Sequence, residues 1–196
     1  MPSSWQSRRP GKRPARGGDT TLAGVSAVLS FTLDTSSVIA GANSEPSAPY
    51  VDQLVEMALA GKIGIFITSG FEVDQRRASV EQRRVNLEYL SRAPVVQVPG
   101  PFRFDMSMPN GDVFIDDEMQ RLDKLITAIV QPEGRTAERA GKRMNDVHHL
   151  IAHRMAGHDC FVTQDDDDIV KKRDRLESEA GIVVMTPPEA VTRALR

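Results

Sequence analysis

The chain has little of what secreted and membrane proteins need. Its single cysteine, Cys160, cannot form an internal disulfide. No stretch reaches the roughly 18 apolar residues of a membrane-spanning helix, and the N-terminus lacks the apolar segment of a secretory signal. We therefore expect a cytoplasmic protein without membrane association, in which Cys160 is a buried core thiol.

Aromatic residues are also scarce. They make up 5% of the chain, with two tyrosines and one tryptophan, Trp5. This scarcity argues against a surface of stacked aromatic rings that would bind single-stranded nucleic acid. The 196 residues are nevertheless enough for a domain with a substantial core, and the hydrophobic fraction of 40% and charged fraction of 27% are typical of globular proteins.

The N-terminal segment has a composition unlike the rest of the chain. Residues 1–26 are rich in proline, glycine, serine and arginine and have no apolar period, so we predict a disordered arm. The first 20 residues carry a net charge of +4, which leaves −6 for the remainder of a chain whose total is −2. A basic arm on an acidic body indicates contact with a polyanion such as nucleic acid. An uncommitted solvated tail is an equally good interpretation.

The remaining residues, 27–196, alternate between two kinds of apolar pattern. Short apolar runs predict strands at 28–33, 63–68, 95–98, 159–163 and 182–185. Helical spacing predicts helices over 49–60, 78–91, 119–129, 146–156 and 170–180, and a further helix that begins at Thr186. Residues 100–113 are expected to form a loop or insertion. This order predicts one α/β domain with a central, mainly parallel sheet flanked by helices.

Four acidic residues stand at the ends of these elements. Asp34, Glu72 and Asp165 follow strand candidates, and Asp146 opens a helix candidate. The carboxyl ends of parallel strands meet at one edge of a sheet, which is where α/β proteins place their ligands. Carboxylates gathered there repel one another unless a cation compensates them, and oxygen ligands suit Mg²⁺ or Mn²⁺. Taken singly, each acid has an ordinary alternative role as a helix cap or turn residue.

Five segments together resemble the PIN domain, a family of metal-dependent ribonucleases that includes the VapC-type toxins. They are residues 31–40 (FTLDTSSVIA), 67–72 (ITSGFE), 145–152 (NDVHHLIA), 161–168 (FVTQDDDD) and 181–189 (GIVVMTPPE). The resemblance extends over about residues 29–193. Each motif is short, and it is their order and spacing that resemble the family.

The resemblance implies an endoribonuclease that hydrolyses RNA phosphodiester bonds. Asp34, Glu72, Asp146 and Asp165 would be its catalytic acids and would hold one or two Mg²⁺ or Mn²⁺ ions, with Asp167 as a further ligand. RNA would be the substrate. An antitoxin protein would be a partner if the chain is the toxin of a type II pair, and a stand-alone nuclease is the alternative. A homodimer and a monomer both remain open.

Several residues near these motifs are candidates for contact with the nucleic acid. Thr35 and Ser36 would orient a ligand carboxylate or bind phosphate, and helix capping is the alternative. Arginine pairs seven residues apart suit the phosphate backbone, although a solvated face partnered by acids such as Glu81 suits them equally. These arginines are Arg76, Arg77, Arg83 and Arg84. We interpret Asp74 as a surface charge.

The histidines offer a second kind of site. His149 and His153 are four residues apart, as zinc ligands on a helix can be, but no second pair with ligand spacing accompanies them. His148 and His149 stand where a PIN domain would have small or apolar residues, so either could contact phosphate near the metal. We favour the simpler interpretation that they are partly buried helix histidines.

Two other classes of function compete with the nuclease. A non-catalytic module that binds nucleic acid or protein on a degenerate PIN fold would bind metal without hydrolysis. A phosphatase of the haloacid-dehalogenase type would need a second aspartate two residues after Asp34, and Ser36 occupies that place.

The arm yields the first testable prediction. Deleting residues 1–26 should flatten the dependence of RNA affinity on salt, because each cation that neutralises a phosphate releases counterions. KM should rise, most clearly at low salt, while kcat stays near that of the full chain. RNA affinity measured against salt concentration for both proteins checks this, and superimposable slopes would identify the arm as an inert tail.

Overall fold

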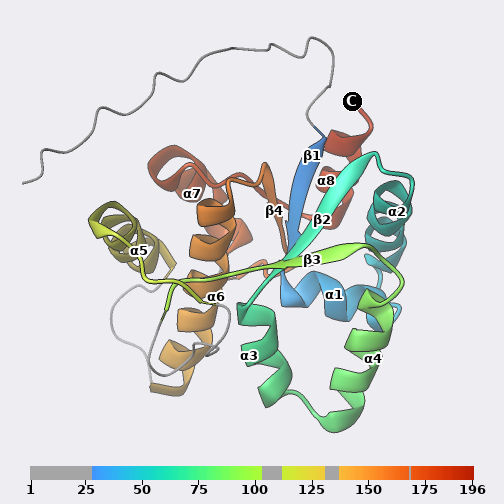
Figure 1. Cartoon of the computed structure of the whole chain (residues 1–196), viewed down its shortest axis with the longest axis horizontal. Coiled ribbons are helices and arrows are strands. Elements are labelled where there is room, and N and C mark those ends of the chain that lie inside the picture. Colours follow the sequence, from blue (N-terminus) through green and yellow to red (C-terminus); the bar gives the residue numbers. More distant parts are fainter. Residues whose placement is uncertain (1–27, 103–111, 131–136, 168) are drawn as a thin grey trace, which may run out of the picture.

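The computed structural model describes residues 28–102, 112–130, 137–167 and 169–196, without the side chains of 137–142. Within these residues, five parallel strands form one sheet in the order β3-β2-β1-β4-β5 (Figure 1). The strands are β1 (Leu29–Leu33), β2 (Ile63–Thr68), β3 (Val95–Val98), β4 (Cys160–Val162) and β5 (Val184–Met185). The predicted arm, and residues 103–111 of the predicted loop, lie outside the described residues.

Eight α-helices connect and flank the strands in the described part of the chain. They are α1 (Thr35–Ala42), α2 (Ala48–Leu59), α3 (Gly70–Arg77), α4 (Val80–Leu90), α5 (Asp117–Val130), α6 (Ala137–Ala156), α7 (Arg173–Ala180) and α8 (Pro187–Ala194). A short 3₁₀ turn, Val170–Lys172, leads into α7. None of these helices is long and apolar enough to cross a bilayer.

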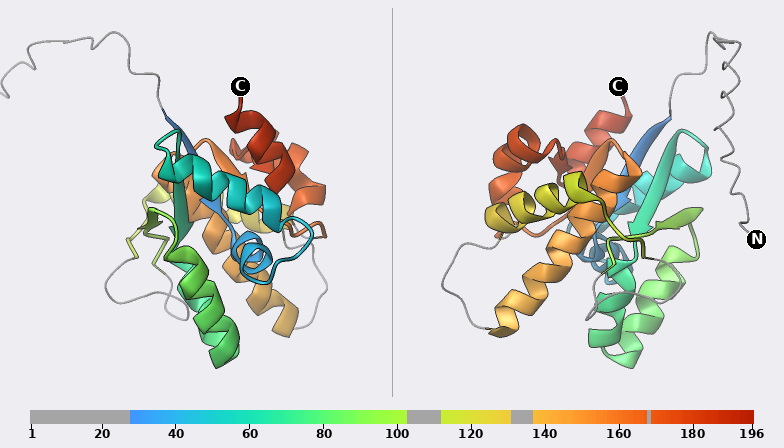
Figure 2. Two further views of the ribbon diagram at one scale, coloured as in Figure 1. Left: turned by 90° about the vertical axis from the view of Figure 1, so that its right-hand side faces the viewer. Right: turned by 60° about the vertical axis from the view of Figure 1, so that its left-hand side comes forward.

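Alternating side chains of the strands divide the core between the two faces of the sheet. Phe31 and Leu33 of β1 pack in one cluster with α1, α2, α4 and α8. Phe161 of β4 and Val184 of β5 pack in the other with α5, α6 and α7. The protein therefore has three layers, and α3 and α4 project past the carboxyl edge of the sheet (Figures 1 and 2). Both faces are covered, as a parallel sheet requires.

The predicted fold class is confirmed, and the sheet is entirely parallel. All five strand candidates correspond to strands, although β5 is only two residues long. The helices α1 and α3 were not predicted. The predicted start of a helix at Asp146 is wrong, because α6 begins at Ala137 and Asp146 lies well inside it. The start of α8 is confirmed as a capping box between Thr186 and Glu189.

A polar seam joins α6 to the sheet beneath it. The Thr32 hydroxyl lies 2.9 Å from Nδ1 of His153 and 2.8 Å from Nδ1 of His158. Because a hydroxyl has one hydrogen and two acceptor lone pairs, at least one of two neutral rings at this hydroxyl must donate from Nδ1. Burial, and after it the charge of the nearby His158, lowers the pKa of His153 to about 3. His153 and His149 are both almost completely buried, whereas the sequence interpretation of His149 was a partly buried residue.

The buried His153 should make the protein acid-sensitive. Its folded pKa lies below the unfolded value near 6.5, so its contribution to stability is complete above pH 6.5 and is lost as the pH falls toward 3. We expect this to cost roughly 2–3 kcal/mol between pH 6.5 and 4.5. Urea unfolding at several pH values should show that His153→Gln loses less stability than the wild type over this range.

The comparison between variant and wild type cancels the contributions of other titrating groups. His158→Gln is the matched control, because His158 is partly exposed and contacts the same hydroxyl. Its profile should stay closer to that of the wild type. Parallel profiles for His153→Gln and the wild type would contradict the assignment.

Candidate functional site

The order of the strands creates a switch point between β1 and β4. From β1 the chain proceeds outward through β2 and β3, and it then returns to add β4 and β5 on the other side. The helices that follow β1 and those that follow β4 lie on opposite faces of the sheet. In open α/β sheets a switch point of this kind is where ligands bind, so we call the carboxyl ends of these two strands the acidic crevice. Asp34 follows β1 directly, and Asp165 lies three residues beyond the end of β4.

Asp34 is buried and held by two hydroxyl groups. It occupies the cap position of α1, but its side chain makes no capping hydrogen bond. Instead its Oδ2 accepts hydrogen bonds from Ser36 Oγ at 2.7 Å and from Thr163 Oγ1 at 2.8 Å. The capping role considered for Asp34 is therefore not what its carboxylate does. One oxygen is fixed by β1, α1 and the end of β4 together.

Asp146 reaches the same crevice from the middle of α6. Burial, followed by the charge of Asp34 and then by those of Asp165 and Asp74, outweighs the opposing charge of His149 and raises its pKa to about 8. Asp34 and Asp165 therefore both lie close enough to Asp146 to raise its pKa. Groups with pKa values displaced by burial and by like charges in a crevice are characteristic of functional sites.

The acidic group from α3 is Asp74, whereas Glu72 points elsewhere. Glu72 accepts a hydrogen bond from Gln97 of β3 at 3.0 Å on the exposed side of the helix. The Oδ1 atom of Asp74 accepts from Asn145 at 2.6 Å, and its Oδ2 atom lies 3.2 Å from Nε2 of His149. Burial raises the pKa of Asp74, but His149, Thr35 and Asn145 outweigh it and leave that pKa below its usual value. Our interpretation of Asp74 as a surface charge was wrong.

His149 lies inside the protein and not on a surface that RNA could reach. It is 1% exposed, and its Nδ1 atom lies 2.6 Å from the hydroxyl of Thr68 at the end of β2. Its Nε2 atom faces Asp74. A side chain at Gly70 would approach this ring within 2.8 Å, so the first residue of α3 must be glycine for the helix to pack here.

The other candidates for metal or phosphate contact lie around the rim. Asp167 is exposed and forms an ion pair with Lys171. Arg84 is paired with Glu81 and Glu88, which is the solvated arrangement considered as its alternative. Arg76, Arg77 and Arg83 are exposed on the projecting α3 and α4.

Thr35 and Ser36 both lie in the first turn of α1. The hydroxyl of Ser36 is engaged with Asp34, and it also accepts from the backbone N–H of Gln164 at 3.1 Å. The Thr35 hydroxyl is buried and has no hydrogen-bond partner among the described residues, although it lies close enough to Asp74 to lower its pKa. A buried hydroxyl without a partner beside a group of carboxylates is a place where a ligand oxygen or water would bind.

The carboxylates do not by themselves form a finished metal cage. In the part of the chain that the structure describes, no group of three or more His, Cys, Asp or Glu has metal-binding geometry. The donor set nevertheless suits a hard divalent cation, because it consists of carboxylate oxygens, and burial together with the charge of Asp34 raises the pKa of Asp146.

A second buried polar cluster lies beside the crevice, toward β3. Ser69 Oγ donates to Asp112 Oδ1 at 2.5 Å and lies 2.8 Å from Nε2 of His148. The backbone N–H of Gly100 also donates to Asp112. Ser69 and the His148 ring are almost completely buried, so His148, like His149, faces the interior. This cluster fastens residues 100 and 112 to α6 and to the end of β2.

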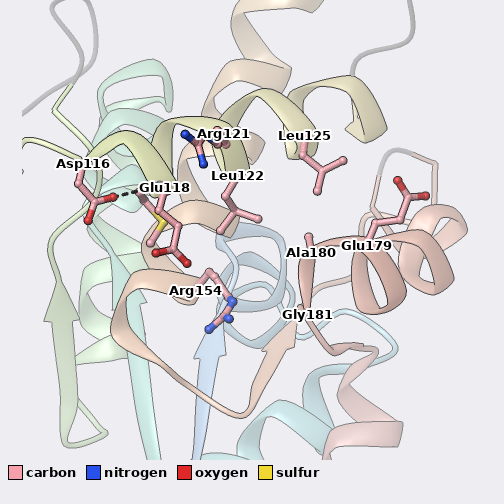
Figure 3. Close-up of a pocket in the computed structure, with 10 residues that line it drawn as sticks. Asp116, Glu118, Arg121, Leu122, Leu125, Arg154, Glu179, Ala180 and Gly181 are labelled. Carbon is pink, nitrogen blue, oxygen red and sulfur yellow. Dashed lines mark hydrogen bonds between the residues drawn. The ribbon is translucent and has the colours of Figure 1, made fainter.

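A hollow of about 590 Å³ lies far from the acidic crevice (Figure 3). It lies between the start of α5 and the carboxyl ends of α6 and α7, which lead into β4 and β5 at the opposite edge of the sheet. Leu122 and Leu125 line it together with Arg154, and at its rim Asp116 Oδ1 accepts from the backbone N–H of Met119. It contains none of the predicted site residues.

In comparisons with known proteins, no family model and no curated sequence matches the chain. The site must therefore be interpreted from its own geometry.

Asp146 should destabilise the protein at neutral pH. Its folded pKa near 8 lies above the unfolded value near 4, so the contribution of this carboxyl group to stability is fully present below pH 4 and is lost as the pH rises toward 8. Asp146→Asn removes this loss and should be more stable by about 2–4 kcal/mol at pH 7. Urea unfolding in a chelating buffer should show the gain at pH 7 and its disappearance near pH 4.

Asp166→Asn is the matched control, because Asp166 is exposed in the same turn as Asp165. Its stability should stay close to that of the wild type at both pH values. An Asp146→Asn protein that is no more stable than wild type at pH 7 would contradict the electrostatic grouping of these acids.

Proposed function

We propose that the chain is a metal-dependent endoribonuclease whose active site is the crevice between β1 and β4. The observation that carries this proposal is the grouping of Asp34, Asp146 and Asp165 at the switch point, with the pKa of Asp146 raised first by burial and then by its acidic neighbours. A group of carboxylates that repel one another is expected where a cation binds. The order of the acidic motifs, which resembles that of PIN-domain ribonucleases, supports the same conclusion.

Asp34, Asp146 and Asp165 would hold the ion, Mg²⁺ or Mn²⁺. When bound, such an ion lowers the pKa of a water molecule and offsets charge on a phosphodiester. The chain's own residues would prepare the site for it. Ser36 and Thr163 fix one oxygen of Asp34 and so direct the other oxygen. The unpartnered hydroxyl of Thr35 is available to donate to a phosphate oxygen or a water molecule.

The arginines on α3 and α4 supply charge for the nucleic-acid backbone. Arg77 and Arg83 are exposed, and these helices project from the carboxyl edge of the sheet, where the crevice opens (Figure 1). Contacts between arginine and phosphate position a nucleic acid without reading its sequence. A substrate that lies along these helices would present its backbone to the acids.

Purified protein should cleave RNA in the presence of Mg²⁺ or Mn²⁺, and excess chelator should stop the reaction. In Asp34→Asn the rate should fall by at least about 100-fold, because a ligand charge is lost from the metal site. The asparagine keeps an oxygen for Ser36 and Thr163, so folding should survive. Cleavage rates and thermal melting of both proteins check this.

Glu72→Gln is the matched control, because Glu72 is a partly exposed acid that contacts Gln97. It should cleave at close to the wild-type rate, and a steep loss would restore Glu72 to the metal site that the sequence predicted. Cleavage by Asp34→Asn at the wild-type rate would overturn the proposal. Metal binding without cleavage by the wild type would favour the non-catalytic binding module.

A further inference from the structure

A buried imidazole stands directly behind the acidic crevice. His149 lies on α6, one turn after Asp146, and its two ring nitrogens contact Thr68 of β2 and Asp74 of α3. It is 1% exposed, whereas the Asp74 side chain is 27% exposed. The ring therefore lies on the protein side of Asp74, and solvent or a ligand reaches the carboxylate from the other side.

The hydrogen atoms available at this point determine what the ring does. The side-chain nitrogen of Asn145 has two hydrogens, and it lies 2.6 Å from Asp74 Oδ1 and 3.2 Å from the carbonyl oxygen of Gly70. With both hydrogens used, Asn145 has none to donate to His149, although the two nitrogens are 3.3 Å apart. Nε2 of His149 must then carry a hydrogen and donate it to Asp74 Oδ2. Both carboxylate oxygens of Asp74 thus have internal donors.

The surrounding charges favour a doubly protonated ring. Burial lowers the pKa of His149, but the hydrogen bond to Asp74 and the charges of Asp34, Asp74 and Asp146 outweigh burial and raise that pKa above its ordinary value. In that state Nδ1 donates to the hydroxyl of Thr68. The charged groups that act on the ring are Asp34 after β1, Asp74 of α3 and Asp146 of α6, and all three are acidic. The imidazolium is therefore the cation that they share.

We infer that His149 serves as a built-in cation that neutralises Asp74, so that the crevice binds one divalent ion, held by Asp34, Asp146 and Asp165. This inference rests on the proposed function and adds the number of ions. A second divalent ion at Asp74 would have to displace the donors from both oxygens and lie beside a positive ring. The Thr35 hydroxyl follows Asp34 in the sequence and lies near Asp74, and it has no hydrogen-bond partner among the described residues. It would contact a ligand of the single ion.

A calorimetric titration of the full chain with Mn²⁺ at pH 7, which counts the bound ions, tests this inference. The wild type should bind one Mn²⁺ per chain. His149→Gln keeps an N–H that can donate to Asp74 but removes the charge, and it should bind two. His153→Gln is the matched control, since it lies one turn further along the same helix at Thr32, and it should still bind one. Two ions in the wild type, or one in His149→Gln, would overturn the inference.

A second measurement needs no variant and no metal. Nitrogen-15 NMR of the metal-free wild type at pH 7 should show both ring nitrogens of His149 protonated, and a neutral ring would overturn the inference. The experiments also separate it from the proposed function. One bound Mn²⁺ without RNA cleavage would refute the nuclease and leave the count of ions intact. Cleavage with two bound ions would do the reverse, and no bound Mn²⁺ would refute both.

Discussion

The docking of α6 across the sheet is the constraint on which the other features depend. Two histidines one turn apart contact two threonines on neighbouring strands, His149 with Thr68 of β2 and His153 with Thr32 of β1. Buried polar groups must find partners, so each pair fixes the helix at one point, and the two pairs together fix its position along the sheet. Because Asp146 lies one turn before His149, this docking also determines how deep Asp146 lies in the crevice.

The acids of the site differ in how well the protein satisfies their charge. Asp34 is satisfied by the hydroxyls of Ser36 and Thr163, and Asp74 is satisfied by Asn145 and His149. Asp146 is different, because burial and its acidic neighbours oppose its charge. In a protein of ordinary stability, a displaced carboxyl of this kind is a substantial cost, and such costs are usually found where a ligand relieves them.

Much of the fold could be predicted from the sequence, because buried parallel strands appear as short apolar runs and their order implies the switch point. The helices α1 and α3 could not, since each is eight residues long and neither has a clear apolar period. The missing helix α3 explains why Glu72 was predicted at the crevice, whereas Asp74 is the acid of α3 that lies there. Glu72 and Asp74 are two positions apart on α3, which separates them by about 200° around the helix, so only one of them can face the crevice. Which of the two does so depends on a helix that the sequence did not reveal.

The carboxylates of Asp34 and Asp165 were predictable because strand ends specify where they lie. The partners of Asp146, Asp74 and His149 were not, because they come from elements far apart in the sequence, and only their packing brings them together. The start of α6 illustrates the difficulty. Its first residues lack an apolar period, so Asp146 was expected to open the helix, although it lies at the middle.

The central position of β1 has a consequence for the way in which the protein is made. Asp34 receives its hydrogen bond from Thr163 across 129 residues of sequence, and β1 pairs with β4 over a similar separation. During synthesis, β1 and β2 can pair early, but the crevice lacks the side formed by β4 until that strand has left the ribosome. Chains are synthesised from the N-terminus at about 5–20 residues per second, so for several seconds the nascent chain would carry Asp34 with Ser36 but without Thr163, the second hydroxyl that holds it. Prematurely terminated chains that lack β4 would therefore have no assembled site, whatever remains of their fold.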